Sequence, residues 1–104
     1  MSTIAITKDN HLNEVTNSTK TVLLDFWASW CGPCRMIAPA IEEVAAERTD
    51  IVVGKVNVDE EPDLARQYGI VSIPTLVVVK NGKVVTQNAG LRPKQAILAM
   101  LDTE

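Results

Sequence analysis

Cysteine, positive charge and long apolar runs are all scarce in this sequence of 104 residues. Only Cys31 and Cys34 are present, and a bridge between them closes a loop too small to constrain the unfolded chain much, which argues against a purely stabilising role. Ten basic residues against 13 acidic ones give a net charge of -3, which is unfavourable for binding nucleic acid or anionic lipid. Apolar runs reach only about six residues, as at 96–101, whereas a membrane-spanning helix needs about 20. We therefore expect neither nucleic-acid nor membrane partners.

The remaining composition fits one globular domain. The length allows a single core, and 46% hydrophobic with 22% charged residues is the usual balance of a folded protein. No repeat, low-complexity run or Pro/Gly/Ser-rich linker divides the chain, so we expect one domain over residues 1–104. The first eight residues lack the basic and apolar segments of a secretory signal, so the expected location is the cytoplasm. In that reducing compartment, a close cysteine pair indicates metal binding or redox chemistry.

Apolar and β-branched runs predict five strands. The nearly continuous run at 21–27 indicates a central strand covered on both faces. Asn81-Gly82 predicts a tight hairpin, because this dipeptide accepts positive φ at both turn positions. The predicted strands are a short one at 4–6, then 21–27, 51–58, 75–79 and 83–86.

Helical periodicity and proline positions predict the elements between these strands. The predicted helices are a weak one from Asp9 or Asn10 towards Ser18, an amphipathic one from about Cys34 to Arg48, a short one from Pro62 to near Gly69, and a last one from Pro93. Pro39 is expected to kink the longest helix, since it removes one backbone hydrogen bond. The order β-α-β-α-β-α-β-β-α predicts an α/β fold with a mixed sheet between helical layers.

The motif Trp30-Cys31-Gly32-Pro33-Cys34 lies between a predicted buried strand and the start of a predicted helix. Cys31 therefore falls near a helix N-terminus, where unpaired N–H groups and the macrodipole favour a thiolate. β-carbons three residues apart on a helix lie about 5–6 Å apart, so a small adjustment allows a disulfide. Gly32 lets the chain pass close to a substrate and Pro33 removes an N–H, and neither adds charge. The pattern favours a reductant with a moderately activated thiolate.

Three other functions compete with disulfide reduction. A zinc site normally needs four ligands, and His11 is the only other soft ligand, so metal would require a dimer. We expect no metal and interpret His11 as an ordinary exposed residue of the first helix, and the acidic run at 59–63 as suited to the first turn of the next helix. A redox-independent scaffold would use the same surface and would survive replacement of both cysteines by Ser. An oxidase or isomerase would be expected to carry His inside the cysteine motif and an export signal.

Residues 25–34, Asp-Phe-Trp-Ala-Ser-Trp-Cys-Gly-Pro-Cys, closely resemble the thioredoxin family. The similarity covers essentially the whole chain, because the tripeptides at 73–75 (Ile-Pro-Thr) and 80–82 (Lys-Asn-Gly), and then Gly90, follow in that family's order. The resemblance implies a thioredoxin fold, in which a central mixed five-stranded sheet is flanked by about four helices on both faces. The chain departs from many members in having four aromatic residues, with Val79 where Phe is common, which bears on core packing and not on chemistry.

The same resemblance implies roles for both cysteines and for two charged residues. Cys31 attacks the substrate disulfide and Cys34 resolves the resulting mixed disulfide. Asp25 deprotonates Cys34, and Lys55 modulates Asp25. From the residues alone, Asp25 interrupts an apolar strand, where burial should raise its pKa towards neutrality. A structural acid satisfied by hydrogen bonds is the alternative interpretation.

The resemblance further implies a cis peptide bond before Pro74 and an apolar docking face that pairs with an extended substrate. The residues at docking positions are Trp30, Val58, Ile73, Pro74, Ala89, Gly90 and Leu91. Val58, Ala89 and Leu91 fit plain packing equally well, and we interpret Trp27 as structural support beneath the site.

The function predicted from these features is general protein-disulfide reduction without a bound cofactor. Electrons must then come from another protein. By resemblance the donor is an NADPH-dependent flavoenzyme, thioredoxin reductase. The implied acceptors are enzymes such as ribonucleotide reductase, peroxiredoxin or methionine sulfoxide reductase, and the protein is expected to act as a monomer.

Overall fold

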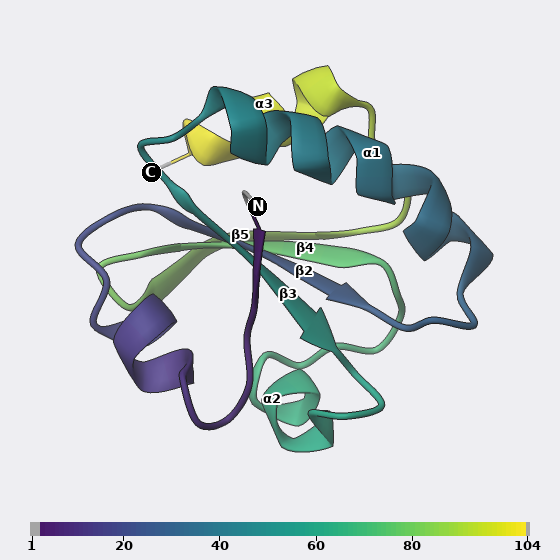
Figure 1. Ribbon diagram of the computed structural model, residues 1–104, viewed down its shortest axis with the longest axis horizontal. Coiled ribbons are helices and arrows are strands. Elements are labelled where there is room, and N and C mark those ends of the chain that lie inside the picture. Colours follow the sequence, from purple (N-terminus) through teal and green to yellow (C-terminus); the bar gives the residue numbers. More distant parts are fainter. Residues whose placement is uncertain (1–2, 104) are drawn as a thin grey trace.

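A computed structural model describes residues 3–103 and arranges their strands in one five-stranded mixed sheet (Figure 1). The strands are β1 (Thr3–Ala5), β2 (Val22–Trp27), β3 (Val52–Asn57), β4 (Thr75–Lys80) and β5 (Lys83–Ala89). Their spatial order is β1-β3-β2-β4-β5. Strands β1, β3 and β2 are parallel, and β4 runs antiparallel to both β2 and β5. The predicted order of elements is confirmed, and β2 occupies the centre of the sheet.

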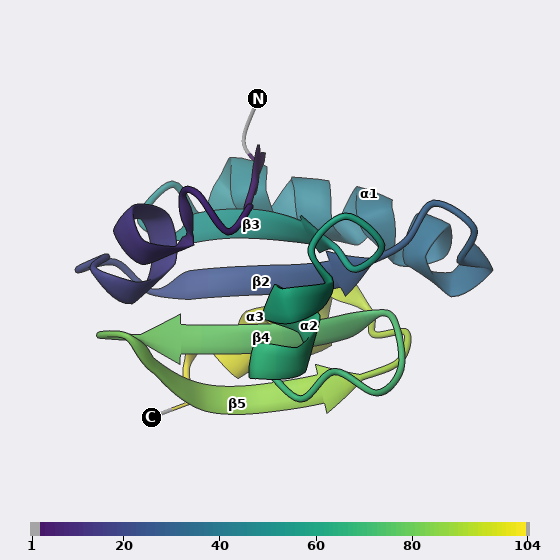
Figure 2. The same ribbon diagram turned by 90° about the horizontal axis from the view of Figure 1, so that it is seen from below.

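Helices cover both faces of this sheet (Figures 1 and 2). One face carries α1 (Gly32–Glu47) and α3 (Lys94–Leu101), and the other carries α2 (Pro62–Gln67) and η1 (Leu12–Thr16), a short π-helical turn. Pro62 and Pro93 stand at the starts of α2 and α3, as predicted. Helix α1 begins at Gly32, two residues before the predicted start, and continues through Pro39. None of the helices in the described residues combines the length and apolar composition that crossing a bilayer needs.

Side chains of β2 alternate between two apolar cores. Leu23 packs with Ile37 and other residues of α1, whereas Leu24 and Phe26 pack on the opposite face with Val15 of η1 and Leu64 of α2. Because successive residues of a strand point to opposite faces, Asp25 projects to the same side as Leu23, towards α1. The alternation therefore brings an acidic side chain beneath the helix that carries the cysteines.

His11 is buried, which contradicts the prediction that it is exposed. Only 9% of its surface is accessible, and its Nε2 lies 2.6 Å from the Tyr68 hydroxyl oxygen. Tyr68 in turn packs against Phe26, so this contact ties the start of η1 to the end of α2. Burial lowers the pKa of His11. The prediction failed because the partner that covers the imidazole lies 57 residues away in sequence.

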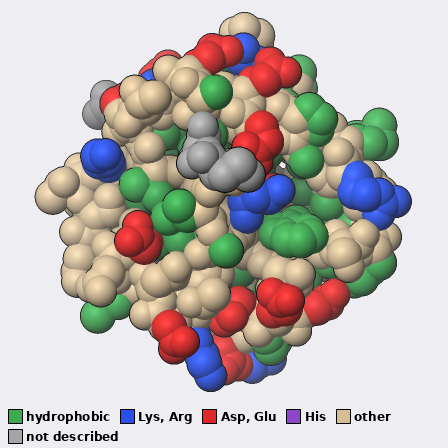
Figure 3. Space-filling model, viewed as in Figure 1, with side chains coloured by type: hydrophobic (Ala, Val, Ile, Leu, Met, Phe, Trp, Pro, Cys, Tyr) green, Lys and Arg blue, Asp and Glu red, His purple; other side chains and the backbone are tan. Residues whose placement is uncertain are grey.

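Charged side chains of both signs are spread over the face seen in Figure 3. That view contains no large basic patch, in keeping with the net charge of -3. Within residues 3–103, no three His, Cys, Asp or Glu side chains gather in a group able to hold a metal ion.

Candidate functional site

The cysteine pair lies where β2 leads into α1. Cys31 and Cys34 form a disulfide with Cα atoms 5.3 Å apart, so the predicted proximity is confirmed. Cys31 is the N-cap of α1, and its Sγ accepts the backbone N–H of Cys34 at 3.2 Å. Unpaired N–H groups and the positive end of the helix dipole stabilise negative charge at this position. The geometry thus favours ionisation of the Cys31 sulfur once the disulfide is opened.

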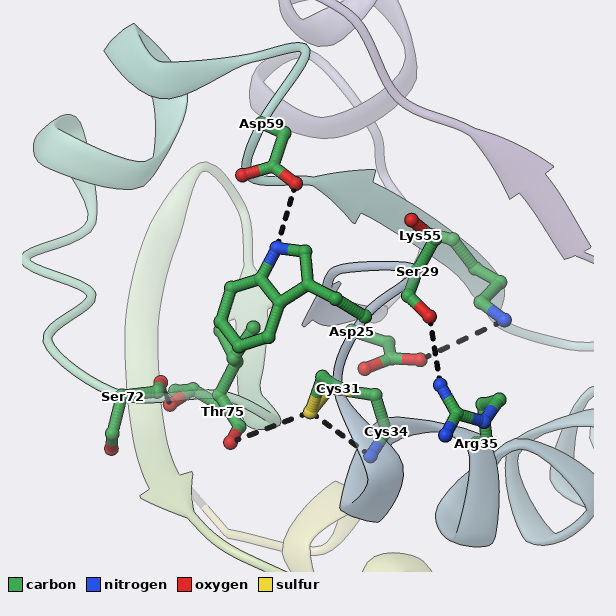
Figure 4. Close-up of a disulfide and its surroundings, with 11 residues drawn as sticks. Asp25, Ser29, Cys31, Cys34, Arg35, Lys55, Asp59, Ser72 and Thr75 are labelled. Carbon is green, nitrogen blue, oxygen red and sulfur yellow. Dashed lines mark hydrogen bonds and ion pairs between the residues drawn. A yellow bond between two sulfur atoms is a disulfide. The ribbon is translucent and has the colours of Figure 1, made fainter.

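Gly32 and Pro33 form the first turn of α1, where the missing N–H of proline breaks no helical hydrogen bond. Arg35 follows them and extends back over the loop that precedes the cysteines. Its Nη1 donates to the carbonyl oxygen of Ser29 at 2.8 Å (Figure 4). Sequence reasoning missed this contact, which holds a cation beside the motif.

Asp25 and Lys55 are neighbours in the register of β2 and β3. Lys55 Nζ lies 3.9 Å from Oδ2 of Asp25, and Figure 4 shows the Asp25 carboxyl between this ammonium and the cysteine pair. Asp25 is 1% exposed, and neither carboxyl oxygen has a hydrogen-bond partner among the described residues. Burial raises the pKa of Asp25 to about 6, while the positive charge of Lys55 acts in the opposite direction. The alternative of a structural acid satisfied by hydrogen bonds therefore loses its support.

An apolar pocket of about 350 Å³ opens beside the disulfide. Three of the predicted docking residues, Trp30, Val58 and Ile73, line it. Trp30 is 67% exposed, and its indole N–H donates to Oδ2 of Asp59 at 2.9 Å (Figure 4). The Ile73 carbonyl oxygen lies 3.8 Å from Sγ of Cys31, a contact that joins the pocket to the reactive sulfur.

The other predicted docking residues do not line this pocket. Pro74 is buried, and the Ile73–Pro74 peptide bond is cis, as the resemblance implied. Gly90 adopts a φ of 97°, a region that favours glycine, and its N–H donates to the Pro74 carbonyl oxygen at 2.8 Å. Ala89 and Leu91 flank Gly90 and are exposed.

Sequence reasoning also missed much of the pocket wall. The additional lining residues are Ala65, Ile70, Val71 and Ser72, from α2 and the segment between α2 and β4. Asp59 was interpreted only as an acid suited to a helix start, although its carboxylate holds the Trp30 indole. Its position directly after the predicted docking residue Val58 was the available signal.

Taken together, a disulfide capping a helix, a buried carboxyl beneath it and an apolar pocket beside it define a thiol–disulfide oxidoreductase. Comparison with known proteins agrees with this class. A family model described as Thioredoxin matches residues 2–103. Thioredoxin 2 of Chlorobaculum tepidum is 50% identical over 97 residues, which span 92% of this chain and 89% of that protein. Thioredoxin of Mycobacterium bovis is 48% identical over 101 residues, which span 96% of this chain and 87% of that protein.

A further relative carries the same domain within a larger chain. The bifunctional thioredoxin reductase/thioredoxin of Mycobacterium leprae is 44% identical over 97 residues, which span 92% of this chain and 21% of that protein. The present chain belongs to the thioredoxin family. It is a protein-disulfide reductase that carries electrons through its cysteine pair.

Proposed function

We propose that this protein is a general reductant of protein disulfides in which Cys31 is the nucleophile and Cys34 the resolving thiol. The observation that carries this assignment is the N-cap position of Cys31, whose sulfur accepts a backbone N–H of α1. Cys34 lies inside the first turn and has no corresponding position at the helix end. The two thiols of the reduced protein should therefore differ in acidity, and the thiolate is the form that attacks.

The proposed cycle balances in two exchanges. The Cys31 thiolate attacks one sulfur of the substrate disulfide, forming a mixed disulfide and releasing the other sulfur as a thiolate, which takes up a proton. Cys34, after losing its proton, attacks Sγ of Cys31, closing the Cys31–Cys34 disulfide and releasing the second substrate sulfur. The substrate gains two electrons and two protons, and the protein loses the same number.

Asp25 is the proposed base for the second exchange. A carboxyl with a pKa of about 6 is mostly ionised at pH 7, so it can accept a proton. Its pKa is also close to the operating pH, which is the condition for an efficient general base. Its location beneath the cysteine pair supports this role (Figure 4). Lys55 is the proposed modulator, because its charge opposes the effect of burial on the Asp25 pKa. Gly32 and Pro33 are proposed to keep the redox potential low by adding no charge to the loop.

We infer that substrates dock in extended form along the pocket beside Ile73. The backbone around Ile73 and Ala89 is proposed to provide strand-like pairing, and Trp30, Val58 and Leu91 are proposed to provide apolar contact. Pro74 and Gly90, joined by a hydrogen bond, are proposed to hold the two backbone segments at the correct separation. Binding through the backbone suits a reductant that accepts many substrates.

The proposed setting is a single-domain monomer in the cytoplasm. Thioredoxin reductase, an NADPH-dependent flavoenzyme, is the proposed electron donor, and the relative from Mycobacterium leprae, whose name joins the two activities, supports this pairing. The proposed acceptors are ribonucleotide reductase, peroxiredoxin and methionine sulfoxide reductase.

Single cysteine variants test the assignment directly. Cys34→Ser should accumulate a mixed disulfide through Cys31 when it is mixed with an oxidised protein substrate, whereas Cys31→Ser should accumulate little. Mass spectrometry of the trapped adducts identifies the sulfur that attacked. Equal trapping by the two variants would overturn the assignment. Retained biological activity in the double serine variant would instead support the redox-independent scaffold.

The base role of Asp25 has its own test. Asp25→Asn should keep the fold and the first exchange but slow release of the mixed disulfide. Stopped-flow kinetics between pH 6 and 8 separate the two steps. Unchanged release in the variant over this range would remove Asp25 from the mechanism.

A further inference from the structure

Trp27 contacts both the cysteine pair and Lys55, but it takes no part in the two thiol–disulfide exchanges. It is the last residue of β2 and lies on the same side of the strand as Asp25, because it follows two residues later. Its side chain packs against the cluster formed by Ala28, Cys31 and Cys34. Its ring also lies beneath the Lys55 ammonium, with Nζ 5.2 Å from the ring centroid. An ammonium at this distance from an indole is attracted by the negative face of the ring.

Lys55 has the freedom to occupy other positions. Its side chain is flexible and 23% exposed, and it borders a second pocket of about 220 Å³. Glu60 and Glu61, from the turn after β3, line the same pocket. Asp25 is nonetheless the only carboxylate within 4.0 Å of Nζ among the described residues. The indole face is the remaining contact that favours this position.

We propose that Trp27 is a positioning residue for disulfide exchange, which holds the Lys55 ammonium beside Asp25 and so controls how readily Asp25 takes a proton. This proposal rests on the proposed role of Asp25 as the base. Trp27 itself touches no substrate and exchanges no proton. It acts through Lys55 alone.

The charges around Asp25 make the expected effect large enough to measure. Lys55 faces it from β3, and Cys34 faces it from α1 (Figure 4). The facing residue of β4 is the apolar Leu76, and Glu60 and Glu61 line the second pocket together with Lys55. Moving Nζ from about 4 Å to about 6 Å at an effective dielectric constant of about 20 raises the Asp25 pKa by about one unit.

The test is a double-mutant cycle read out by the titration of Asp25. Carbon-13 NMR of the oxidised protein follows the carboxyl without interference from thiols and without substrate. Trp27→Leu should raise the Asp25 pKa by about half a unit to one unit, and Trp27→Phe by less, since a phenyl ring is a weaker partner for a cation. In the Lys55→Met background, Trp27→Leu should cause no further rise. Trp30→Leu, the matched change at the exposed tryptophan, should leave this titration unchanged.

Two results would overturn the proposal. One is an Asp25 titration that stays in place in both Trp27 variants, and the other is a rise of the same size with and without Lys55. Trp27→Phe keeps an aromatic ring in the space, so the proposal remains testable if Trp27→Leu fails to fold. Failure of the base role would appear separately, as unchanged mixed-disulfide release in Asp25→Asn.

Discussion

Asp25 lies in the middle of an apolar strand, with a carboxyl group that is 1% exposed and without a hydrogen-bond partner among the described residues. Removing a carboxylate from water disfavours its charged form, and this desolvation outweighs the attraction of Lys55. A buried acid of this kind destabilises the fold at every pH at which it is ionised. Its location next to a redox-active disulfide is typical of functional groups with altered pKa values.

Replacing Asp25 by Asn should therefore stabilise the protein in a way that depends on pH. The folded-state pKa of about 6 lies above the unfolded value of 3.8, so the destabilisation is absent below about pH 4 and complete above about pH 6. Two pKa units correspond to roughly 3 kcal/mol. Urea unfolding of the oxidised proteins should show the difference between variant and wild type growing by about this amount between pH 4 and pH 7.5. A difference that does not change with pH would show that ionisation of the buried carboxyl is not the cause.

Individual site residues were predictable only where the signal is local. The cysteine motif, the buried acid and the Ile73-Pro74 pair could be recognised because each is a short run of sequence. The bond between Asp59 and Trp30 and the contact between Trp27 and Lys55 each join residues 28 or 29 positions apart. The sequence marks neither pair as a contact, although the position of Asp59 directly after Val58 was a local signal that Asp59 lies near the docking residues.

Among the helices and strands, the predictions held best where backbone chemistry is restrictive. Asn81-Gly82 forms the turn between β4 and β5, with a φ of 53° at Asn81 and 78° at Gly82, because few other dipeptides accept both angles. Strand β5 extends to Ala89, three residues beyond its predicted end, since its ladder with β4 continues where its side chains no longer alternate clearly. The first helix, predicted from Asp9 or Asn10 towards Ser18, is shorter in the structure, where η1 covers Leu12–Thr16 and only Val15 is buried.

Packing between β1, β3 and β2 depends on the absence of a side chain at Gly54. A Cβ at this position would lie 2.5 Å from Cγ1 of Ile6 and 3.1 Å from Cδ2 of Leu24. Gly54→Ala should therefore lower the free energy of unfolding by about 1–3 kcal/mol, because neighbouring side chains must shift. Urea unfolding measures the loss.

Gly32→Ala is the matched control for this prediction. The nearest atom to its Cβ would be Nη2 of Arg35, 3.9 Å away, which is ordinary van der Waals contact. Its stability should stay close to that of the wild type. Equal losses in the two variants would show that the close approach at Gly54 is not the cause.

In the molecule as a whole, the site forms where one end of the sheet meets the start of α1. Trp27 is the last residue of β2, and the cysteines follow it at the start of α1. Pro74 directly precedes β4, and Ala89 is the last residue of β5. The antiparallel pairing of β4 with β2 and with β5 is what brings these three segments to one edge. Sequence patterns indicated the strands and the resemblance indicated the assembly, but the shape of the pocket depended on residues of α2 and of the segment between α2 and β4.

Trp30 should matter more for the binding of large substrates than for the rate of disulfide exchange itself. Trp30→Ala should raise KM for a protein disulfide about tenfold and change the rate with a small aliphatic disulfide little, because a small disulfide does not reach the pocket wall. Val84→Ala changes an exposed apolar residue of β5 that lines neither pocket, so it should leave the kinetics with both substrates unchanged. Steady-state kinetics with both substrates make the comparison. An equal loss with the small disulfide would place Trp30 in the chemical step.

The proposed cycle requires that the start of α1 make one sulfur of the pair more acidic than the other. NMR titration of the fully reduced protein, labelled with carbon-13 at the cysteine β-carbons, measures both pKa values in one sample. We expect a Cys31 pKa clearly below the ordinary value of about 8.5 and a Cys34 pKa above that of Cys31. Two thiols that both titrate near about 8.5, or a Cys34 more acidic than Cys31, would refute this assignment.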